Sequence, residues 1–283
     1  MWSSASEDAK RAMRTPRDND SELSRRDFVA RGAALALGIS AVGSLTADNG
    51  DRPLEGFGVG IDPGHNGRNW TDPRYIDRPV WNGHNVETCD TTGTATDAGY
   101  PESQYNWNVA VMLRDRLRGA GARVVMTRHS NDGIGPCVTR RAEILDRAHL
   151  DVAVDIHADG GPPDGRGFSV LVPVRGFENA KVIGSSYRFG REVRSAFVNR
   201  TPMPISDYYG KGGIVPRDDL AGLNLTTVPK VLIECGNMRN STDASLLVTP
   251  RFQRQVATAL LVAIENFLRG EHPTGGKELR DPL

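Results

Sequence analysis

The chain has 283 residues, enough to bury a hydrophobic core in one or two domains. Charged residues (25%) and hydrophobic residues (38%) occur in the proportions of a soluble globular protein, and 35 basic residues balance 35 acidic ones. With no net positive charge and no basic run interleaved with aromatic residues, the composition argues against a nucleic-acid partner.

The first fifty residues are predicted to be an export signal rather than part of the fold. In "SRRDFVARGAALALGISAV", Arg25 and Arg26 precede a weakly apolar stretch over 33–42. This order is typical of secretory signals, and the paired arginines indicate the twin-arginine route. The alternative is an amphipathic N-terminal helix. We therefore expect an exported protein of the periplasm, cell wall or extracellular space. No run of 18 apolar residues predicts a membrane span in the mature chain.

The next segments alternate between strand and helix patterns. A strand is predicted at 57–61 and is followed by a long polar loop at 62–101. The apolar spacing after Glu102 predicts a helix that ends at Gly119 to Gly121. Three more strands and one more helix are predicted in this half of the chain: strand 122–127, helix 138–148, strand 151–156 and strand 167–174.

The second half completes an α/β pattern. A helix is predicted at 179–198, then a loop with at most one short strand, then a strand at 230–235. A final helix is predicted to begin at Pro250 and to end at Gly270. Strands that alternate with helices predict a single three-layer α/β domain over residues 51–270, followed by a flexible tail at 271–283.

The three cysteines do not have the spacing of a zinc site, because none forms a C-x-x-C pair. Outside the cytoplasm a disulfide is allowed. Cys89 and Cys137 both lie in loop sequence, whereas Cys235 ends an apolar strand. We therefore predict a Cys89–Cys137 disulfide, with Cys235 free and packed under the edge of the sheet.

Histidines and carboxylates gather where strands end. His65 follows the first strand, His157 follows strand 151–156, Glu234 lies in the last strand, and Glu102 opens the long helix. In an open α/β sheet, ligands bind beyond the carboxyl ends of the strands. Two histidines and one carboxylate form the ligand set of a catalytic zinc, and a second carboxylate supplies a base for water. Spacing alone does not decide which glutamate binds and which catalyses.

Weaker candidates surround this set. Asp62 is a candidate for orienting a ligand histidine by contact with the ring nitrogen that does not bind the metal. The alternative is that Asp-Pro simply starts a turn. Asp155 has the same two interpretations, since it precedes His157 by two residues and shares its strand face. Three further side chains are candidates for a substrate groove: Lys211, Arg217 and Asn237. The stretch around Lys211 is equally consistent with a flexible loop.

Four motifs together carry a family resemblance. "IDPGHNG", "PESQYNWNVA", "DIHADG" and "VLIECGN" occur in this order. The chain resembles, over about residues 57–269, the zinc-dependent N-acetylmuramoyl-L-alanine amidases, the group whose members help to separate bacterial daughter cells. The resemblance implies one zinc ion per chain, held by His65, Glu102 and His157, with Glu234 as the catalytic acid/base. It also implies a mixed sheet of about six strands flanked by helices.

The implied partner is peptidoglycan or its muropeptides, cleaved between N-acetylmuramic acid and L-alanine. The chain departs from the family pattern in three ways. Cys235 replaces the small residue, often Thr, that follows the last glutamate, the 62–101 loop is long, and no wall-binding domain is visible. Ordinary elements account for the stretch 159–230, so no helix of the kind that plugs the site in some relatives is evident. We therefore expect the mature domain to be active without a partner. We also expect a monomer.

Two alternatives remain. A zinc carboxypeptidase or another cell-wall amidohydrolase would use the same ligand set on a different amide bond. An inactive cell-wall binding protein belongs to another class of function and would typically lack a ligand or the base. All four positions are filled here.

Overall fold

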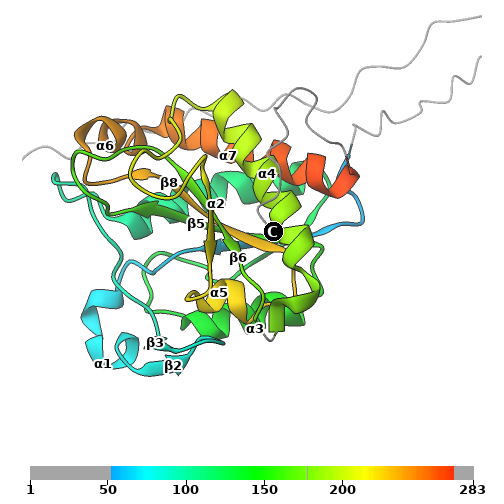
Figure 1. Ribbon diagram of the computed structural model, residues 1–283, viewed down its shortest axis with the longest axis horizontal. Coiled ribbons are helices and arrows are strands. Elements are labelled where there is room, and N and C mark those ends of the chain that lie inside the picture. The colour runs from blue at the N-terminus through cyan, green and yellow to red at the C-terminus, as the bar shows by residue number, and fades with distance from the viewer. Residues whose placement is uncertain (1–51, 177, 271–283) are drawn as a thin grey trace, which may run out of the picture. The chain divides into compact units, whose positions relative to one another are not determined.

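The computed structural model describes residues 52–176 and 178–270. The predicted export signal at 1–50 and the predicted tail at 271–283 lie outside the described residues. The described residues contain a six-stranded mixed sheet with helices on both faces (Figure 1), which confirms the predicted α/β fold class.

The main sheet has the strand order β4-β1-β5-β8-β6-β7. Strands β4, β1, β5 and β8 are mutually parallel, β6 runs antiparallel to β8, and β7 runs parallel to β6. The carboxyl ends of β1, β5 and β8 therefore meet at one edge. The bounds are β1 (Gly58–Pro63), β4 (Arg123–Met126), β5 (Val152–Asp159), β6 (Ser169–Pro173), β7 (Ile214–Arg217) and β8 (Lys230–Asn237).

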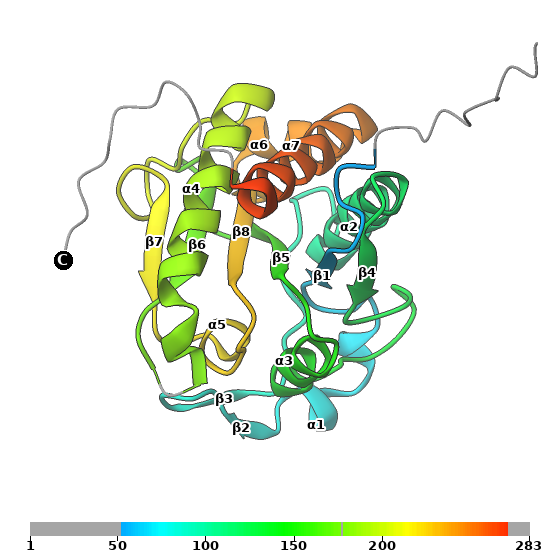
Figure 2. The ribbon, with the colours of Figure 1, turned by 90° about the vertical axis from the view of Figure 1, so that its right-hand side faces the viewer.

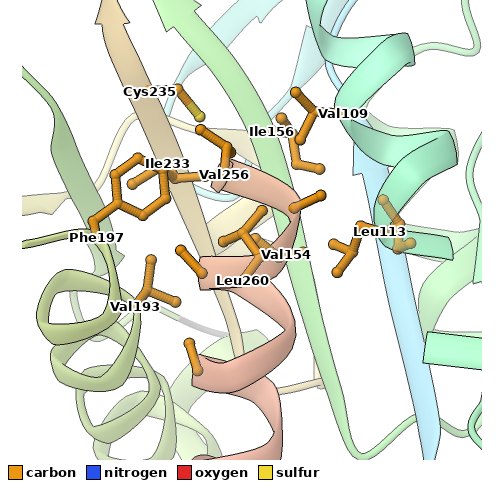
Figure 3. Close-up of a cluster of buried hydrophobic side chains, with 14 of the residues drawn as sticks. Val109, Leu113, Val154, Ile156, Val193, Phe197, Ile233, Cys235, Val256 and Leu260 are labelled. Carbon is orange, nitrogen blue, oxygen red and sulfur yellow. The ribbon is translucent and has the colours of Figure 1, made fainter. Parts of the chain in front are cut away.

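One face of the sheet carries the main hydrophobic core. Helices α2 (Glu102–Gly119), α4 (Ile183–Arg200) and α7 (Pro250–Arg269) cover it, as Figures 1 and 2 show. Figure 3 shows Val256 and Leu260 of α7 inserted between side chains of the sheet and those of α2 and α4. Full burial of each such side chain is worth roughly 1.5–3 kcal/mol, so this face anchors the strands that carry the site.

The opposite face is partly polar. It is covered by α3 (Val138–Arg147), by α5 (Ala221–Asn224) and by the segment 66–92. The strands turn alternate side chains to this face, so Asp155 and His157 of β5 point away from the main core.

The segment 62–101 is more ordered than the loop that the sequence predicts. It contains η1 (Asn69–Thr71), α1 (Pro73–Ile76) and a hairpin of β2 (Pro79–Trp81) and β3 (Val86–Thr88). These elements are three or four residues long, too short to show a periodic pattern. The Asp72 side chain accepts a hydrogen bond from the backbone N–H of Tyr75, and Pro73 occupies the first helical position.

Three further elements differ from prediction. β5 continues through His157 to Asp159, because His157 and Asp159 still pair with β8, so His157 lies within the strand rather than after it. The helix predicted at 179–198 is divided into η2 (Glu178–Lys181) and α4. Helix α6 (Ser241–Leu247), which the Asn240 side chain caps, was not predicted.

Cys89 and Cys137 form a disulfide that ties the segment 66–92 to the start of α3. Cys235 has a free thiol and is fully buried in the main core. In the part of the chain that the structure describes, we find no helix that is both long and apolar enough to cross a membrane.

Candidate metal centre

Three side chains converge at the edge where β1 and β5 end. His65, Glu102 and His157 each offer a ligand atom within 4.8 Å of the other two. Glu102 lies between the rings, with Oε2 3.2 Å from His65 Nε2 and Oε1 2.8 Å from His157 Nδ1. The structure thus brings together the three residues that the family resemblance implies as ligands.

The backbone fixes the positions of His65 and Glu102. His65 has a φ of 57°, a left-handed conformation that residues other than glycine rarely adopt, and such strain is often found at functional sites. Glu102 is the first residue of α2, where the helix dipole favours a carboxylate. The backbone N–H groups of Thr94 and Ala158 donate to its two oxygens.

Two glycines make room for the rings. A Cβ at Gly64 would overlap the imidazole of His157. A Cβ at Gly93 would lie 2.7 Å from both Glu102 Oε2 and His65 Cδ2, closer than real Cβ contacts come. Neither glycine was selected from the sequence. The one available signal was that Gly64 directly precedes His65, a candidate ligand.

Glu234 completes the cluster from the neighbouring strand. It pairs with His157 across β5 and β8, and its Oε2 is buried with no hydrogen-bond partner. Burial raises the pKa of Glu234 to about 8, and the negative charges of Glu102 and Asp159 act in the same direction. A carboxylate whose pKa is close to neutral suits proton transfer.

The charges of the region suit a bound cation. Burial would lower the pKa of His65, but the carboxylates of Glu102 and Asp90 outweigh it and raise that pKa to about 9. The negative potential that raises the pKa of this imidazole also favours a bound cation. Two imidazoles and one carboxylate are donors that zinc prefers, so the donor set fits a divalent zinc ion.

The outer nitrogens of both rings face aspartates. Nε2 of His157 lies 3.2 Å from Asp155, and Nδ1 of His65 lies 3.4 Å from Asp90 and 3.1 Å from the carbonyl oxygen of Thr91. Metal-binding histidines commonly make such contacts.

Asp62 instead pairs with buried cations, Lys230 and Arg141. The sequence patterns did not single out Asp90, Arg141 or Lys230. The usable signals were that Asp90 follows a cysteine and that Lys230 begins an apolar strand four residues before Glu234.

The comparisons with known proteins agree with this geometry. A family model described as N-acetylmuramoyl-L-alanine amidase matches residues 59–266, a range that includes all four residues of the cluster. The chain belongs to the N-acetylmuramoyl-L-alanine amidase family. Zinc dependence is typical of this amidase family.

Individual relatives span nearly the same region. The N-acetylmuramoyl-L-alanine amidase Rv3717 of Mycobacterium tuberculosis is 36% identical over 236 residues, 83% of this chain and 94% of the relative. The crystal structure of the amidase Ami1 from Mycobacterium smegmatis has a TM-score of 0.73 and 40% identity, covering 77% of this chain and 99% of that one. Apo Ami1 from Mycobacterium abscessus has a TM-score of 0.71 and 39% identity, covering 76% and 100%.

In this amidase a cavity of about 210 Å³ opens beside the cluster. Its walls come from β1, β5, β8, the segment 66–92, α3 and the start of α5. They combine both histidines with apolar and acidic groups, among them His65, His157, Glu87, Val138, Leu220, Leu223 and Leu232. The Glu87 carboxylate accepts a hydrogen bond from the backbone N–H of Ala221, which links the β2–β3 hairpin to α5 across this cavity.

The three groove candidates of the amidase lie apart. Lys211 is exposed in the loop before β7. Arg217 pairs with Pro173, four residues or about 13 Å along β6 from the position opposite Glu234, and forms an ion pair with Asp219. Asn237 is fully buried and its amide donates to the carbonyls of Pro162 and Gly165, so it holds a loop and is not accessible to a substrate.

Proposed function

We propose that this amidase hydrolyses the amide bond between N-acetylmuramic acid and the L-alanine of the stem peptide in peptidoglycan. The observation that carries the proposal is a His–Glu–His cluster with an unpaired glutamate on the adjacent strand, in a chain of this family. We propose that one zinc ion per chain is held by His65, Glu102 and His157.

Zinc in such a site supplies a Lewis acid that acidifies water and polarises the scissile carbonyl. The chain's own residues do the rest. Glu102 contacts both histidines and holds their inner nitrogens toward one point. Glu234 stands beside His157 and has one oxygen free to take a proton.

Glu234 is proposed to move that proton. It accepts a proton from the attacking water and then passes it to the amine of L-alanine as the carbon–nitrogen bond breaks. The products are a free stem peptide and a glycan without it. The raised pKa of Glu234 suits both directions of transfer, because the group accepts and returns a proton near neutral pH.

The products decide between this reaction and its rival. Purified protein is incubated with defined muropeptides, and the products are identified by mass spectrometry. Release of the intact stem peptide supports the amidase, whereas loss of a single terminal amino acid would indicate a carboxypeptidase. Binding without any product would indicate a wall-binding protein.

We further propose that the chain is exported by the twin-arginine route, acts during daughter-cell separation, and works as a monomer without an activating partner. The elements between His157 and Glu234 support partner independence. Helix α4 packs on β6 and α7 in the main core, away from the cluster, and α5 has four residues. Full inactivity on soluble muropeptides that a second protein relieves would contradict this.

A further inference from the structure

A chain of buried charges connects the outer nitrogens of the two proposed ligand histidines. It begins at His157, whose Nε2 lies 3.2 Å from Asp155 Oδ1. The other oxygen of Asp155 lies 3.4 Å from Lys230 Nζ. The same ammonium lies 2.8 Å from Asp62 Oδ2, which brings the chain from β8 and β5 to β1.

The second half of the chain returns to His65. Asp62 Oδ1 lies 2.9 Å from Arg141 Nη1, and Arg141 Nη2 lies 3.1 Å from Asp90 Oδ2. Asp90 Oδ1 then lies 3.4 Å from Nδ1 of His65. Each aspartate therefore divides its two oxygens between two different partners, and the charges alternate in sign along the chain.

The two cations are the unusual members. Lys230 has no exposed surface, and Arg141 is 3% exposed. Burying ions is costly, and apolar residues of similar size often stabilise a fold as well as a buried ion pair does. Packing alone therefore does not account for a lysine at this position of β8. The position of Lys230 instead indicates a role at the site, because Lys230 and Glu234 lie on the same face of one strand.

Arg141 holds more than its two aspartates. Its guanidinium also donates to the backbone carbonyls of Pro63 and His65, at 2.8 and 2.9 Å. These bonds fix the turn in which His65 takes its left-handed conformation. A planar fork with several donors can satisfy all these acceptors at once, whereas a lysine ammonium cannot.

We propose that Lys230 and Arg141 are positioning residues that, through Asp155, Asp62 and Asp90, orient the two zinc-binding histidines as one connected unit. Lys230 acts on His157 through Asp155, and Arg141 acts on His65 through Asp90. Asp62 joins the two halves. This inference rests on the proposed zinc site, and it adds two residues that lie outside the proposed ligand set.

The test measures zinc affinity in the absence of substrate, by competition with a chromogenic chelator. Lys230→Met and Arg141→Lys are compared with Lys181→Met and Arg140→Lys, which change exposed residues of the same types. Loss of support for a ligand histidine typically weakens metal binding by about 10- to 100-fold. We expect that loss in the first pair and unchanged affinity in the control pair.

A merely structural role predicts a different result. It would lower the melting temperature of the chelator-treated protein and leave the zinc affinity of the folded protein unchanged. We also expect the double variant to lose less affinity than the product of the single losses, because both cations act on Asp62. At saturating zinc, kcat should fall while KM for soluble muropeptides stays constant.

If Lys230→Met does not fold, the isosteric variants Asp155→Asn and Asp90→Asn test the same proposal. These aspartates contact the proposed ligand histidines directly. Folded variants with zinc affinity equal to that of the wild type would overturn the proposal. Because affinity is measured without substrate, a negative amidase assay on the wild type would count against the proposed reaction alone.

Discussion

His157 and Glu234 lie directly opposite each other on the adjacent parallel strands β5 and β8, and their side chains leave the same face of the sheet. Such strands are about 4.8 Å apart. The register of these two strands therefore places a proposed metal ligand next to the proposed base. Oε2 of Glu234 is buried there without a partner.

Glu234→Gln should retain zinc and lose hydrolysis by about 10²- to 10⁴-fold, the usual worth of a general acid/base. The amide keeps the shape of the carboxylate but cannot accept and return the proton. Zinc content and turnover of a soluble muropeptide measure the two effects separately. Glu143→Gln, at an exposed position on α3, is the control. Turnover close to that of the wild type would remove Glu234 from the mechanism.

His157→Ala should lose stoichiometric zinc, because it removes one of three protein ligands. Elemental analysis of the purified protein should give one zinc per chain for the wild type and for His129→Ala, which changes an exposed histidine. Chelator treatment of the wild type should abolish activity and lower the melting temperature, since a ligand that binds only the folded state stabilises it by about 2.7 kcal/mol at 100 times its Kd. A full zinc complement in His157→Ala would show that the ligand set is wrong.

Gly64→Ala should weaken zinc binding although it adds only one methyl group. That methyl would overlap the His157 ring, so the ring must rotate or β1 must shift. Gly119→Ala is the matched control, because a Cβ there meets open space at the end of α2. We expect Gly119→Ala to bind zinc normally and to gain up to about 1 kcal/mol in stability. Equal zinc affinity in both variants would mean that the ring tolerates the methyl group.

Reduction of the Cys89–Cys137 disulfide should loosen the support of His65. Asp90 and Thr91, which contact Nδ1 of His65, directly follow Cys89. The sequence separation is 48 residues, and the chain-entropy model assigns such a loop about 4 kcal/mol. The double serine variant should therefore unfold at lower denaturant concentration and bind zinc more weakly. Non-reducing peptide mapping checks the pairing, and a bridge that includes Cys235 would refute it.

Asp62 should make the protein sensitive to acid. Burial would raise its pKa, but Lys230 and Arg141 hold the pKa of Asp62 well below its ordinary value of 3.8. A group with a depressed pKa in the folded state contributes stability above its unfolded pKa, and this is lost as the pH falls through the folded pKa. Wild-type stability should therefore decline progressively below about pH 4.

The acid slope is measured by denaturation with a chelator present, so that zinc release does not contribute. Asp62→Asn should be less stable at neutral pH. Between about pH 5 and about pH 2, the range in which aspartates titrate, its free energy of unfolding should fall less steeply than that of the wild type. Parallel declines in the variant and the wild type would show that other carboxylates dominate acid unfolding.

The local patterns of the sequence are sufficient to predict the long elements. Helices α2, α3 and α7 begin and end within a few residues of the predicted bounds, because apolar spacing and glycine stops are local signals. His65, His157, Glu102 and Glu234 were identifiable as a set, because the carboxyl ends of parallel strands meet at one edge whatever their order. The assignment of roles to the two glutamates required the family resemblance, since spacing alone leaves it open.

Only the tertiary structure decided how the set is supported. Asp62 and Lys230 are 168 residues apart in the chain, and their contact depends on the sheet order β1-β5-β8, which no local pattern encodes. Short elements such as β2, β3 and α5 have three or four residues and no periodicity of their own, and they depend on tertiary contacts such as the hydrogen bond from the Ala221 N–H of α5 to the Glu87 carboxylate of β3. Local propensities thus specify where long helices and strands form, whereas the partners of buried charges depend on which segments the fold brings together.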